Sequence, residues 1–311
     1  MISFREHIDL HPYTTFRVGG KARYFFEVKS ETDLLEALRL AREQVMSVFV
    51  LGGGSNILFS DRGFDGLVLK MENREISNRG DGSIFVEAGV ALHTVVERAR
   101  EWGYGGMERL AGIPGTMGGA IRGNAGAFGA ETAQGVSSVH ALDRGTLEVR
   151  EYSKEQCEFG YRQSFFKTHP EHILLSAELQ LTPGSDPEAL ETVIRETIDT
   201  REKKHPQRIL CAGSFFMNPV VIDPALRKEF ERDTGMPAKD DKLPAGWIID
   251  HVGLRGKEIG GAKVSDIHPN YLINTGHATA ESILILASLI KQRVRTELGV
   301  RLREEVQMVG F

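Results

Sequence analysis

The spacing of hydrophobic residues along the chain predicts a mixture of strands and helices. Short apolar runs bounded by turn residues predict strands at 22–28, 48–51, 67–71, 84–88, 136–142, 147–152 and 173–181. Apolar residues at helical spacing predict helices over 31–44, with Ser30 as N-cap, and over 92–102. The opening of the chain is therefore expected to be of the α+β class.

The pattern is interrupted at Pro183-Gly184-Ser185 and again near residue 205. A helix is predicted to follow the first interruption through about Lys204, and a domain boundary is expected near His205-Pro206. From Cys211 the pattern starts again, and a long amphipathic helix is predicted over 280–298. We therefore expect a second, smaller domain in the last third of the chain.

Composition narrows the class of protein. The chain has 311 residues, of which 41% are hydrophobic, and a net charge of −5. These values are typical of a globular protein of two domains and exclude a disordered or collagen-like chain. Without a basic excess, neither nucleic acid nor an anionic membrane is indicated as a partner. Two cysteines are too few for a disulfide framework or a cysteine metal site, and neither a signal peptide nor a membrane-spanning stretch is present, so a cytoplasmic location is expected.

Glycine is the one residue type in clear excess, with 34 residues in 311, against roughly 7% in average proteins. The glycines crowd into 52–54, 103–106 and 112–129, between periodic segments, instead of forming a flexible linker. This placement favours loops that face a ligand.

The first glycine loop follows the strand predicted at 48–51. Its small residues would expose main-chain N–H groups, and Ser55 and Asn56 add side-chain donors, so the loop has the elements of a phosphate-binding cradle. Ile57 stands where the dinucleotide fingerprint requires a third glycine, and no P-loop motif occurs, which argues against a Rossmann or P-loop site. A tight turn without a ligand explains the spacing equally well.

The second glycine-rich segment, 111–119 with its continuation 124–127, is expected to be an irregular loop. It is too long for a turn, and loops beyond about 12 to 15 residues are usually functional or disordered. Its glycines would allow a flat or phosphorylated ligand to approach the main chain closely. A purely structural connection is the alternative.

Three shorter motifs carry side chains with acid, base or anion-binding chemistry. Arg162 lies among aromatic residues, where desolvation strengthens its attraction for a carboxylate or an oxyanion, but an arginine stacked on a surface aromatic fits as well. Ser214 is either a proton donor or a hydroxyl that caps a turn. Glu304 and Glu305 are adjacent, so on a strand at most one of them points into a site. Neither H-E-x-x-H nor G-x-S-x-G occurs, which removes the main support for a zinc protease or an α/β-hydrolase.

Taken together, these motifs resemble those of the UDP-N-acetylenolpyruvoylglucosamine reductase (MurB) family of flavoenzymes. The resemblance extends over nearly the whole chain and is carried by residues 15–20, 51–58, 111–127, 161–167, 212–219, 245–250 and 305–306. It implies an α+β fold: a vanillyl-alcohol-oxidase-like (PCMH-type) FAD-binding domain of two α+β subdomains, and a C-terminal α+β substrate domain. Residues 1–70 and 300–311 would form the first subdomain, 71–205 the second, and 206–299 the substrate domain.

The resemblance also implies which residues bind FAD. The pyrophosphate would be held by Gly53, Gly54, Ser55 and Asn56. The isoalloxazine and its surroundings would be contacted by Pro114, Gly115, Thr116, Gly118, Gly119, Asn124 and Gly126. Neither loop contains a histidine for covalent attachment, so non-covalent FAD is expected. No metal is implied.

The reaction implied by the resemblance is the NADPH-dependent reduction of UDP-N-acetylglucosamine enolpyruvate to UDP-N-acetylmuramate in peptidoglycan precursor synthesis. NADPH reduces the flavin and leaves, and hydride then passes to the vinyl carbon distal to the substrate carboxylate. Arg162 and Glu305 match positions that stabilise the resulting enolate, and Ser214 matches the proton donor. Positions that line the UDP-sugar pocket are matched by Asn218, Lys242 and Arg255.

Two departures from the family pattern accompany the resemblance. Met217 occupies the place of a basic residue, and the stretch 173–205 lacks the tyrosine-bearing insertion that some members fold over the substrate diphosphate, so a more open pocket is expected. The oligomeric state is not fixed by the sequence, and a monomer is compatible with it. Two other functions stay open: an FAD-dependent oxidase with the same type of flavin domain, and a flavin- or UDP-sugar-binding protein without activity.

Overall fold

The structure is a computed structural model that describes residues 2–204 and 209–311, and the chain divides into two compact units. Unit 1 consists of Met1–His7, Arg23–Gly53 and Asp65–Lys203, and unit 2 of Ile8–Ala22, Gly54–Phe64 and Lys204–Phe311. Each unit is therefore assembled from three separate stretches of sequence. The three-part division given above stays a prediction, and its boundary near His205-Pro206 lies outside the described residues.

Unit 1 contains most of a four-stranded sheet with a helix packed on it. The strands lie in the order β1-β2-β5-β3, where β1 is Arg5–Asp9, β2 Lys21–Val28, β5 Phe64–Met71 and β3 Val48–Leu51. Helix α1 (Glu31–Glu43) begins at Ser30, whose hydroxyl accepts a hydrogen bond from the Asp33 N–H. Its apolar face, with Leu34 and Leu38, is buried with Leu67 and Leu69 of β5 in one core.

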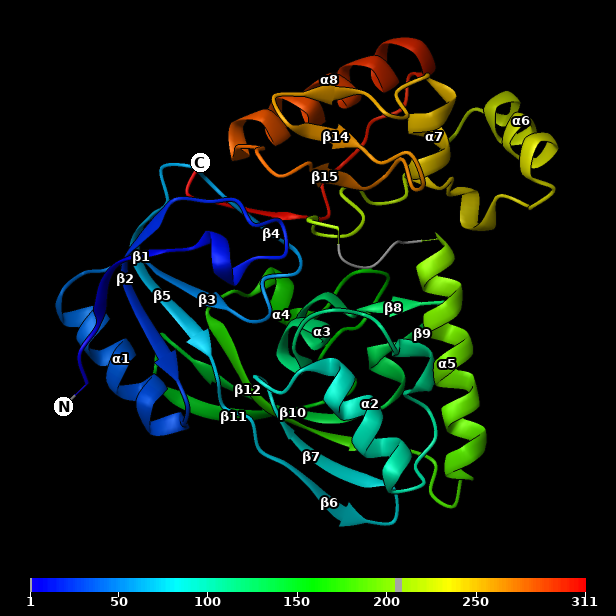
Figure 1. Ribbon diagram of the computed structural model, residues 1–311. Coiled ribbons are helices and arrows are strands. Elements are labelled where there is room, and N and C mark those ends of the chain that lie inside the picture. Colours follow the sequence, from blue (N-terminus) through cyan, green and yellow to red (C-terminus); the bar gives the residue numbers. More distant parts are fainter. Residues whose placement is uncertain (1, 205–208) are drawn as a thin grey trace. The chain divides into compact units, whose positions relative to one another are not determined.

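The rest of unit 1 is built around a five-stranded antiparallel sheet (Figure 1). Its order is β11-β10-β12-β7-β6, with bounds β6 Ile76–Gly80, β7 Ser83–Glu87, β10 Val136–Asp143, β11 Glu148–Ser153 and β12 His172–Gln180. The helices of this part are α2 (Leu92–Glu101), α3 (Met117–Gly123), α4 (Phe165–Thr168) and α5 (Pro187–Lys204), with a short ribbon of β8 (Gly126–Ala127) and β9 (Ala130–Glu131). Apolar residues of α2, α3 and α5 share one core with β7, β10 and β12.

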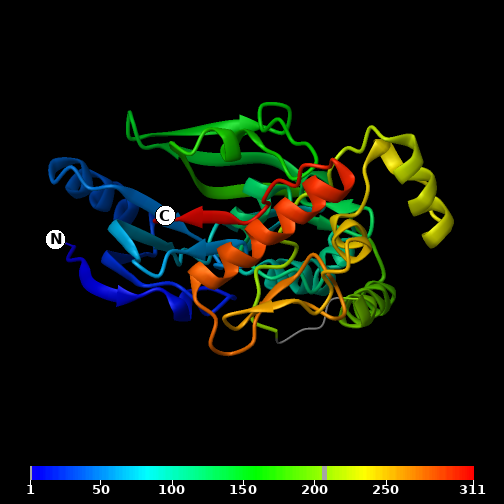
Figure 2. The ribbon, with the colours of Figure 1, turned by 90° about the horizontal axis from the view of Figure 1, so that it is seen from above.

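Unit 2 is dominated by its longest helix, α8 (Ala280–Leu298), which lies along the three-stranded antiparallel sheet β13-β14-β15 (Figures 1 and 2). The strands are β13 (Glu258–Ile259), β14 (Ala262–Val264) and β15 (Leu272–Asn274), preceded by α6 (Pro224–Thr234) and α7 (Ala245–His251). The chain ends with β16 (Gln307–Val309), which pairs in parallel with β4 (Ile57–Phe59). The segment Gly54–Phe64, which contains β4, therefore belongs to unit 2 although it is distant from the rest of that unit in sequence.

The predicted elements are confirmed with boundaries shifted by a few residues at most. The strand at 48–51 and the helix at 280–298 are reproduced to the residue. One prediction is wrong: the segment 111–127 is not irregular throughout, because α3 lies inside it. Despite three glycines, this helix forms because the Thr116 hydroxyl accepts a hydrogen bond from the Gly119 N–H and because Met117 and Ile121 are buried in the core.

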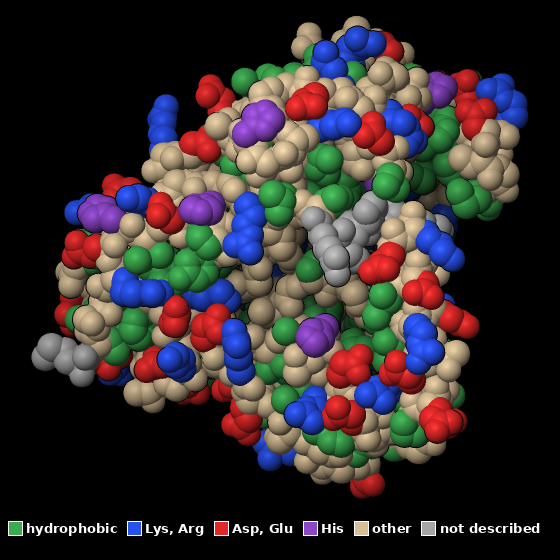
Figure 3. All heavy atoms as spheres, in the orientation of Figure 1, with side chains coloured by type: hydrophobic (Ala, Val, Ile, Leu, Met, Phe, Trp, Pro, Cys, Tyr) green, Lys and Arg blue, Asp and Glu red, His purple; other side chains and the backbone are tan. Residues whose placement is uncertain are grey.

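Among the described residues, no helix is both long and apolar enough to cross a membrane. Figure 3 shows basic and acidic side chains interspersed over the face it draws. This mixed surface agrees with the net charge of −5.

Candidate functional site

Two glycine loops of unit 1 meet through their main chains. A Cβ atom added to Gly53 would lie 2.6 Å from the Cα of Gly115, and one added to Gly52 would lie 2.8 Å from the Thr116 hydroxyl. Real side chains do not tolerate such distances, so both positions require glycine. The loops that were predicted as two separate cofactor-binding motifs are therefore one packed structure.

The exposed part of these loops carries almost no side chains. Gly53, Pro114 and Gly119 are exposed, and Gly115 is half-buried with a φ of +121°. A Cβ on Gly119 would meet only the Thr116 hydroxyl, at an ordinary 3.7 Å. We call the four residues Gly53, Pro114, Gly115 and Gly119 the glycine surface. Such a surface fits FAD, because a flat ring or a phosphate can lie directly against main chain.

The first turn of α3 does not contribute free N–H groups to this surface. The Met117 N–H donates to the Val90 carbonyl at 2.8 Å, and the Gly118 N–H donates to the Ala88 carbonyl at 2.9 Å. Gly118 itself is buried, and a Cβ there would lie 2.8 Å from that of Ala88. Gly118 therefore packs α3 closely against Ala88, and its predicted contact with FAD stays a prediction.

The first glycine loop continues from Gly53 into unit 2. Gly54 has a φ of +66° and no room for a side chain beside the Tyr13 carbonyl, and its own carbonyl accepts a hydrogen bond from the Thr15 N–H at 3.1 Å. Ser55 is half-buried and Asn56 is exposed. The Asn56 side-chain amide donates to the Glu305 carbonyl at 3.1 Å. A predicted cofactor residue thus also fixes the segment of a predicted catalytic residue.

The residues after α3 hold Arg162. Asn124, fully buried in the left-handed conformation that ends α3, donates from its side chain to Glu131 and to the Gly160 carbonyl, each at 2.9 Å. The Arg162 guanidinium donates to the Gly126 carbonyl at 2.7 Å and to the Asn124 carbonyl at 3.5 Å. Asn124, Gly126 and Arg162, separated by nearly 40 residues in sequence, are brought together.

Arg162 itself has a strained main chain. Its φ is +53°, in the left-handed region that a non-glycine residue occupies at a cost on the order of 1–3 kcal/mol. The Lys167 ammonium, which donates to the Arg162 carbonyl at 2.7 Å, helps to hold this conformation. The guanidinium carbon also lies 5.5 Å from the centre of the exposed Tyr161 ring. Stacking on a surface aromatic, the structural alternative considered for Arg162 above, is therefore compatible with the functional role.

Ser214 starts a short extended segment of unit 2 that is held from both sides. On one side it pairs with Tyr271, and the next N–H, that of Phe215, donates to the Asn270 carbonyl at 2.8 Å. On the other side the Phe215 carbonyl accepts a hydrogen bond from the Glu305 N–H at 2.8 Å. The main chain of Glu305 is thus anchored one residue from Ser214.

The two adjacent glutamates have different surroundings. The Glu304 carboxylate pairs with the Lys291 ammonium at 2.6 Å, an interaction made on the side of α8. Glu305 is half-buried on the neighbouring position. The expectation that at most one of the two points into a site agrees with this arrangement, since Glu304 is occupied elsewhere.

Ser214 also lines a pocket of about 390 Å³ within unit 2. Asn218 and Arg255 line the same pocket, together with Pro244, Gly246, Trp247, Asp250, His268, Pro269 and Asn270. The structure therefore brings together three of the residues singled out from sequence. Lys242 is not among the lining residues; its main chain ends a 3-10 helix and pairs with Val220.

Two of these polar side chains have partners in the protein. The Arg255 guanidinium binds both carboxylate oxygens of Asp250, at 2.7 and 2.6 Å, and this carboxylate raises the pKa of Arg255. The Asn218 side-chain oxygen accepts a hydrogen bond from the Ala245 N–H at 3.0 Å and so caps α7. Both side chains are consequently fixed in orientation.

Sequence reasoning missed Asp250, Trp247 and His268. The first two lie in a segment that carried the family resemblance, but nothing in the sequence indicated a partner for Arg255. Burial lowers the pKa of His268, and nearby Arg255 adds to this shift, so the imidazole is neutral at pH 7. No sequence signal distinguishes His268 from the other nine histidines.

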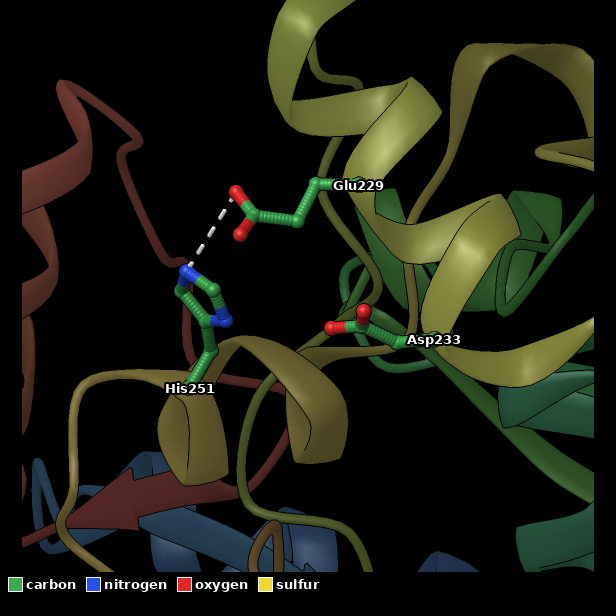
Figure 4. A group of neighbouring side chains, drawn as sticks. All are labelled: Glu229, Asp233 and His251. Carbon is green, nitrogen blue, oxygen red and sulfur yellow. Dashed lines mark ion pairs between the residues drawn. The ribbon is translucent and has the colours of Figure 1, made fainter.

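One other group of unit 2 has side chains of the kinds that ligate metals. Figure 4 shows Glu229 and Asp233 of α6 facing His251 of α7, with ligand atoms within 4.8 Å of one another. Both carboxylates bind Arg232, at 3.2 and 3.1 Å, and the His251 Nε2 lies 3.7 Å from Glu229. Arg232 offsets part of the acidic charge, and the contact of His251 with Glu229 links α7 to α6. That no metal takes part in function stays a prediction.

Comparisons with known proteins identify relatives over nearly the full chain. A family model described as UDP-N-acetylenolpyruvoylglucosamine reductase, C-terminal domain, matches residues 205–309, and a model of an FAD binding domain matches residues 22–149. The UDP-N-acetylenolpyruvoylglucosamine reductase of Solibacter usitatus (strain Ellin6076) is 37% identical over 300 residues, which cover 96% of this chain and 94% of the relative. That of Pseudomonas aeruginosa is 35% identical and covers 98% of both chains.

A solved structure agrees with these sequence matches. The crystal structure of UDP-N-acetylenolpyruvylglucosamine reductase (MurB) from Thermus caldophilus is 30% identical, covers 99% of this chain and 100% of its own, and superimposes with a TM-score of 0.78. Together with the match to the FAD-binding domain, this confirms the predicted fold class.

Proposed function

Because the chain belongs to the UDP-N-acetylenolpyruvoylglucosamine reductase (MurB) family, we propose that it reduces UDP-N-acetylglucosamine enolpyruvate to UDP-N-acetylmuramate with NADPH as the reductant. The product is a precursor of peptidoglycan. A cytoplasmic site of action is part of the proposal, since both cysteines are free thiols, which suits a reducing compartment.

FAD would be held mainly by main chain. The glycine surface offers a bare area for the isoalloxazine, and the loop from Gly53 to Asn56 offers small residues for the diphosphate. When bound, FAD would supply the redox chemistry that connects NADPH with the substrate. The chain's own task is to hold both reactants, to meet the negative charge that develops, and to donate a proton.

Arg162 is proposed to meet the negative charge. Hydride addition to the vinyl group pushes electrons onto the substrate carboxylate, and a fixed guanidinium stabilises this charge more in the transition state than in the ground state. The carbonyls of Asn124 and Gly126 orient the guanidinium in advance, so little reorganisation is needed at the moment of reaction.

Ser214 is proposed to donate the proton to the carbon next to the carboxylate. Its segment is fixed on both edges by hydrogen bonds to Asn270 and Glu305, which gives the hydroxyl a defined position. A serine is a weak acid, so its contribution depends on that position and on a polarising neighbour, a role we propose for Glu305. A positioned proton donor typically contributes about 100- to 10,000-fold in rate.

The UDP-sugar would occupy the pocket of unit 2. Asn218 offers its side-chain N–H₂ group while its oxygen caps α7, and Arg255 offers positive charge that is partly compensated by Asp250. Lys242, which lies outside the pocket lining, is proposed to act at the outer end of an extended ligand. A pocket of about 390 Å³ is at the lower end for small-molecule sites, which fits one moiety of the sugar nucleotide.

One observation carries the proposal most directly: Ser214, singled out as the proton donor, lines the same pocket as Asn218 and Arg255, singled out for the UDP-sugar. The test is an anaerobic stopped-flow experiment that follows flavin absorbance. The purified protein is first reduced with NADPH and then mixed with UDP-N-acetylglucosamine enolpyruvate. Rapid reoxidation is expected, and Ser214→Ala is expected to slow it by at least about 100-fold while leaving reduction by NADPH nearly unchanged.

Ser137→Ala is the matched control, because Ser137 is exposed on β10 of unit 1. Equal damage to both half-reactions by Ser214→Ala would overturn the assignment of the proton donor. Flavin reduction without reoxidation by the substrate would favour an oxidase, to be tested with oxygen as acceptor. Bound flavin that NADPH does not reduce would favour a binding protein without activity.

A further inference from the structure

Arg122, near the end of α3, is half-buried, whereas Arg39, Arg109 and Arg144 of unit 1 are exposed. Arg100, for comparison, pairs with both Glu97 and Glu191 at 3.1 Å. Across the described residues, 2–204 and 209–311, no hydrogen bond or ion pair engages the Arg122 guanidinium; only its carbonyl is used, by the Ser164 hydroxyl at 2.7 Å. The side chain is half-buried all the same, and burial alone lowers its pKa.

An unpaired and partly desolvated cation is unfavourable for folding. A guanidinium that is partly removed from water loses free energy that an ion pair normally returns. The nitrogens of Arg122 are not among the buried polar atoms that lack a hydrogen bond, so they keep contact with solvent, but no carboxylate of the described residues pairs with them. Residues that break a rule of this kind without local compensation are found mostly at functional sites. The absent partner is therefore to be sought among ligands.

The position of Arg122 on α3 indicates which ligand. Helical side chains lean toward the N-terminus and cover residues three and four positions earlier, here Gly119 and Gly118. Gly118 faces the sheet, whereas Gly119 is exposed and belongs to the glycine surface. A Cβ on the neighbouring Gly123 would meet no atom within 4 Å. Arg122 thus lies one turn of α3 beyond Gly119, next to the glycine surface.

We propose that Arg122 is a cofactor-binding residue whose guanidinium pairs with an anionic group of FAD. This inference rests on the proposed function. FAD has two sources of such charge: the diphosphate, which is always anionic, and the isoalloxazine, which is anionic at neutral pH after two-electron reduction. The Arg122 guanidinium would then form its ion pair only when FAD is bound.

The test compares Arg122→Gln, Arg122→Lys and a control, Arg144→Gln, in the full-length chain. Arg144 is exposed in the turn between β10 and β11, so its loss removes the same charge from unit 1 without touching α3. FAD affinity is measured by fluorescence titration of the deflavinated protein. We expect Arg122→Gln to weaken FAD binding at least about 10-fold, Arg122→Lys to restore most of the loss, and Arg144→Gln to have no effect.

The thermal midpoint of the deflavinated protein separates ligand binding from a structural role. Loss of an uncompensated charge should leave this Tm unchanged or raise it, even though FAD binding is weakened. A lower Tm for Arg122→Gln, or failure of this variant to fold, would overturn the proposal, because it would show that the guanidinium stabilises the chain itself. Unchanged affinity for both oxidised and reduced FAD would overturn it as well.

The midpoint potential of bound flavin distinguishes the two anionic groups. If Arg122 pairs with the diphosphate, both redox states lose affinity equally and the potential does not change. If it pairs with the reduced isoalloxazine, each tenfold preferential loss of reduced FAD lowers the potential by about 30 mV. A wild-type chain that binds no FAD would refute the proposed function, whereas normal binding by both Arg122→Gln and wild type would refute only the role of Arg122.

Discussion

The glycine surface of unit 1 and the pocket of unit 2, the two proposed binding sites, are built in opposite ways. The glycine surface is main chain from two loops, packed so closely that a Cβ at Gly53 would lie 2.6 Å from Gly115. The pocket is lined by side chains, and its polar members are held by neighbours, as Arg255 is by Asp250. The first site depends on the absence of side chains and the second on their pairing.

This difference predicts how each site responds to substitution. A surface made of main chain should lose its ligand affinity abruptly on substitution, because the packed loops leave no space for an added side chain. A pocket of paired side chains should respond gradually, and a second substitution should restore part of what the first removes. The four experiments below address this contrast, from the largest expected effect to the smallest.

Replacement of Gly53 tests the abrupt response. Gly53→Val would force its side chain against the Gly115 main chain and separate the two loops. We expect at least about a 100-fold weaker affinity for FAD, or about 2.7 kcal/mol. The ratio of flavin to protein absorbance after purification, followed by titration with FAD, measures the effect. Normal flavin content would show that the loops do not need to touch. Gly53→Ala, whose Cβ alone would lie 2.6 Å from the Gly115 Cα, should already lose most of this affinity.

Arg255 and Asp250 test the gradual and reversible response. Arg255→Gln leaves the Asp250 carboxylate unpaired in the pocket, where it should repel an anionic substrate and raise KM about 10-fold without affecting flavin reduction by NADPH. Adding Asp250→Asn should recover part of this loss. The coupling between the two substitutions, measured as a double-mutant cycle on kcat/KM, should be at least about 0.5 kcal/mol. Strict additivity would contradict the pairing.

Asn218 tests whether pocket side chains also stabilise unit 2. Asn218→Ala removes the acceptor of the Ala245 N–H at the start of α7. We expect a loss of about 1 kcal/mol in the free energy of unfolding, the typical cost of a lost helix cap. Chemical denaturation monitored by circular dichroism measures it, and Asn218→Asp, which keeps the acceptor, should lose less. Equal losses for both variants would argue against the capping role.

His268 gives the smallest effect and concerns pH. Its pKa is lowered in the folded protein, mainly by burial. The unfolded chain binds a proton at this histidine as pH falls below about 6.5, whereas the folded chain resists protonation, so stability is lost as pH falls through that value. His268→Gln should lose less stability between pH 7.5 and 5.5 than the wild type does, by up to about 1 kcal/mol in urea denaturation. The same loss in both proteins would contradict the lowered pKa.

The contrast also explains how much could be predicted from sequence. Regular elements could be predicted because their apolar periodicity is local, as in α8. The two closely packed glycine loops could be located because glycine is identified directly in the sequence, whereas their binding of FAD stays a prediction. Helix α3 was missed because its stability comes from burial of Met117 and Ile121, which outweighs its three glycines. The pairing of Arg255 with Asp250, the pocket position of His268 and the isolation of Arg122 depend on which segments become neighbours, which residue types alone do not encode.

The parallel pairing of β4 with β16 has a consequence for synthesis of the chain. Leu58 and Phe59 are fully buried in unit 2, yet their strand partner, Gln307–Val309, is translated some 250 residues later. Translation adds about 5–20 residues per second, so an apolar strand edge stays unpaired for many seconds in the nascent chain. Residues 8–22 also belong to unit 2, so they too can pack completely only after the last part of this unit has been synthesised. Unit 2 therefore completes its folding only after residues 307–309 have been synthesised, and in the interval before this, aggregation or capture by a chaperone competes most directly with native assembly.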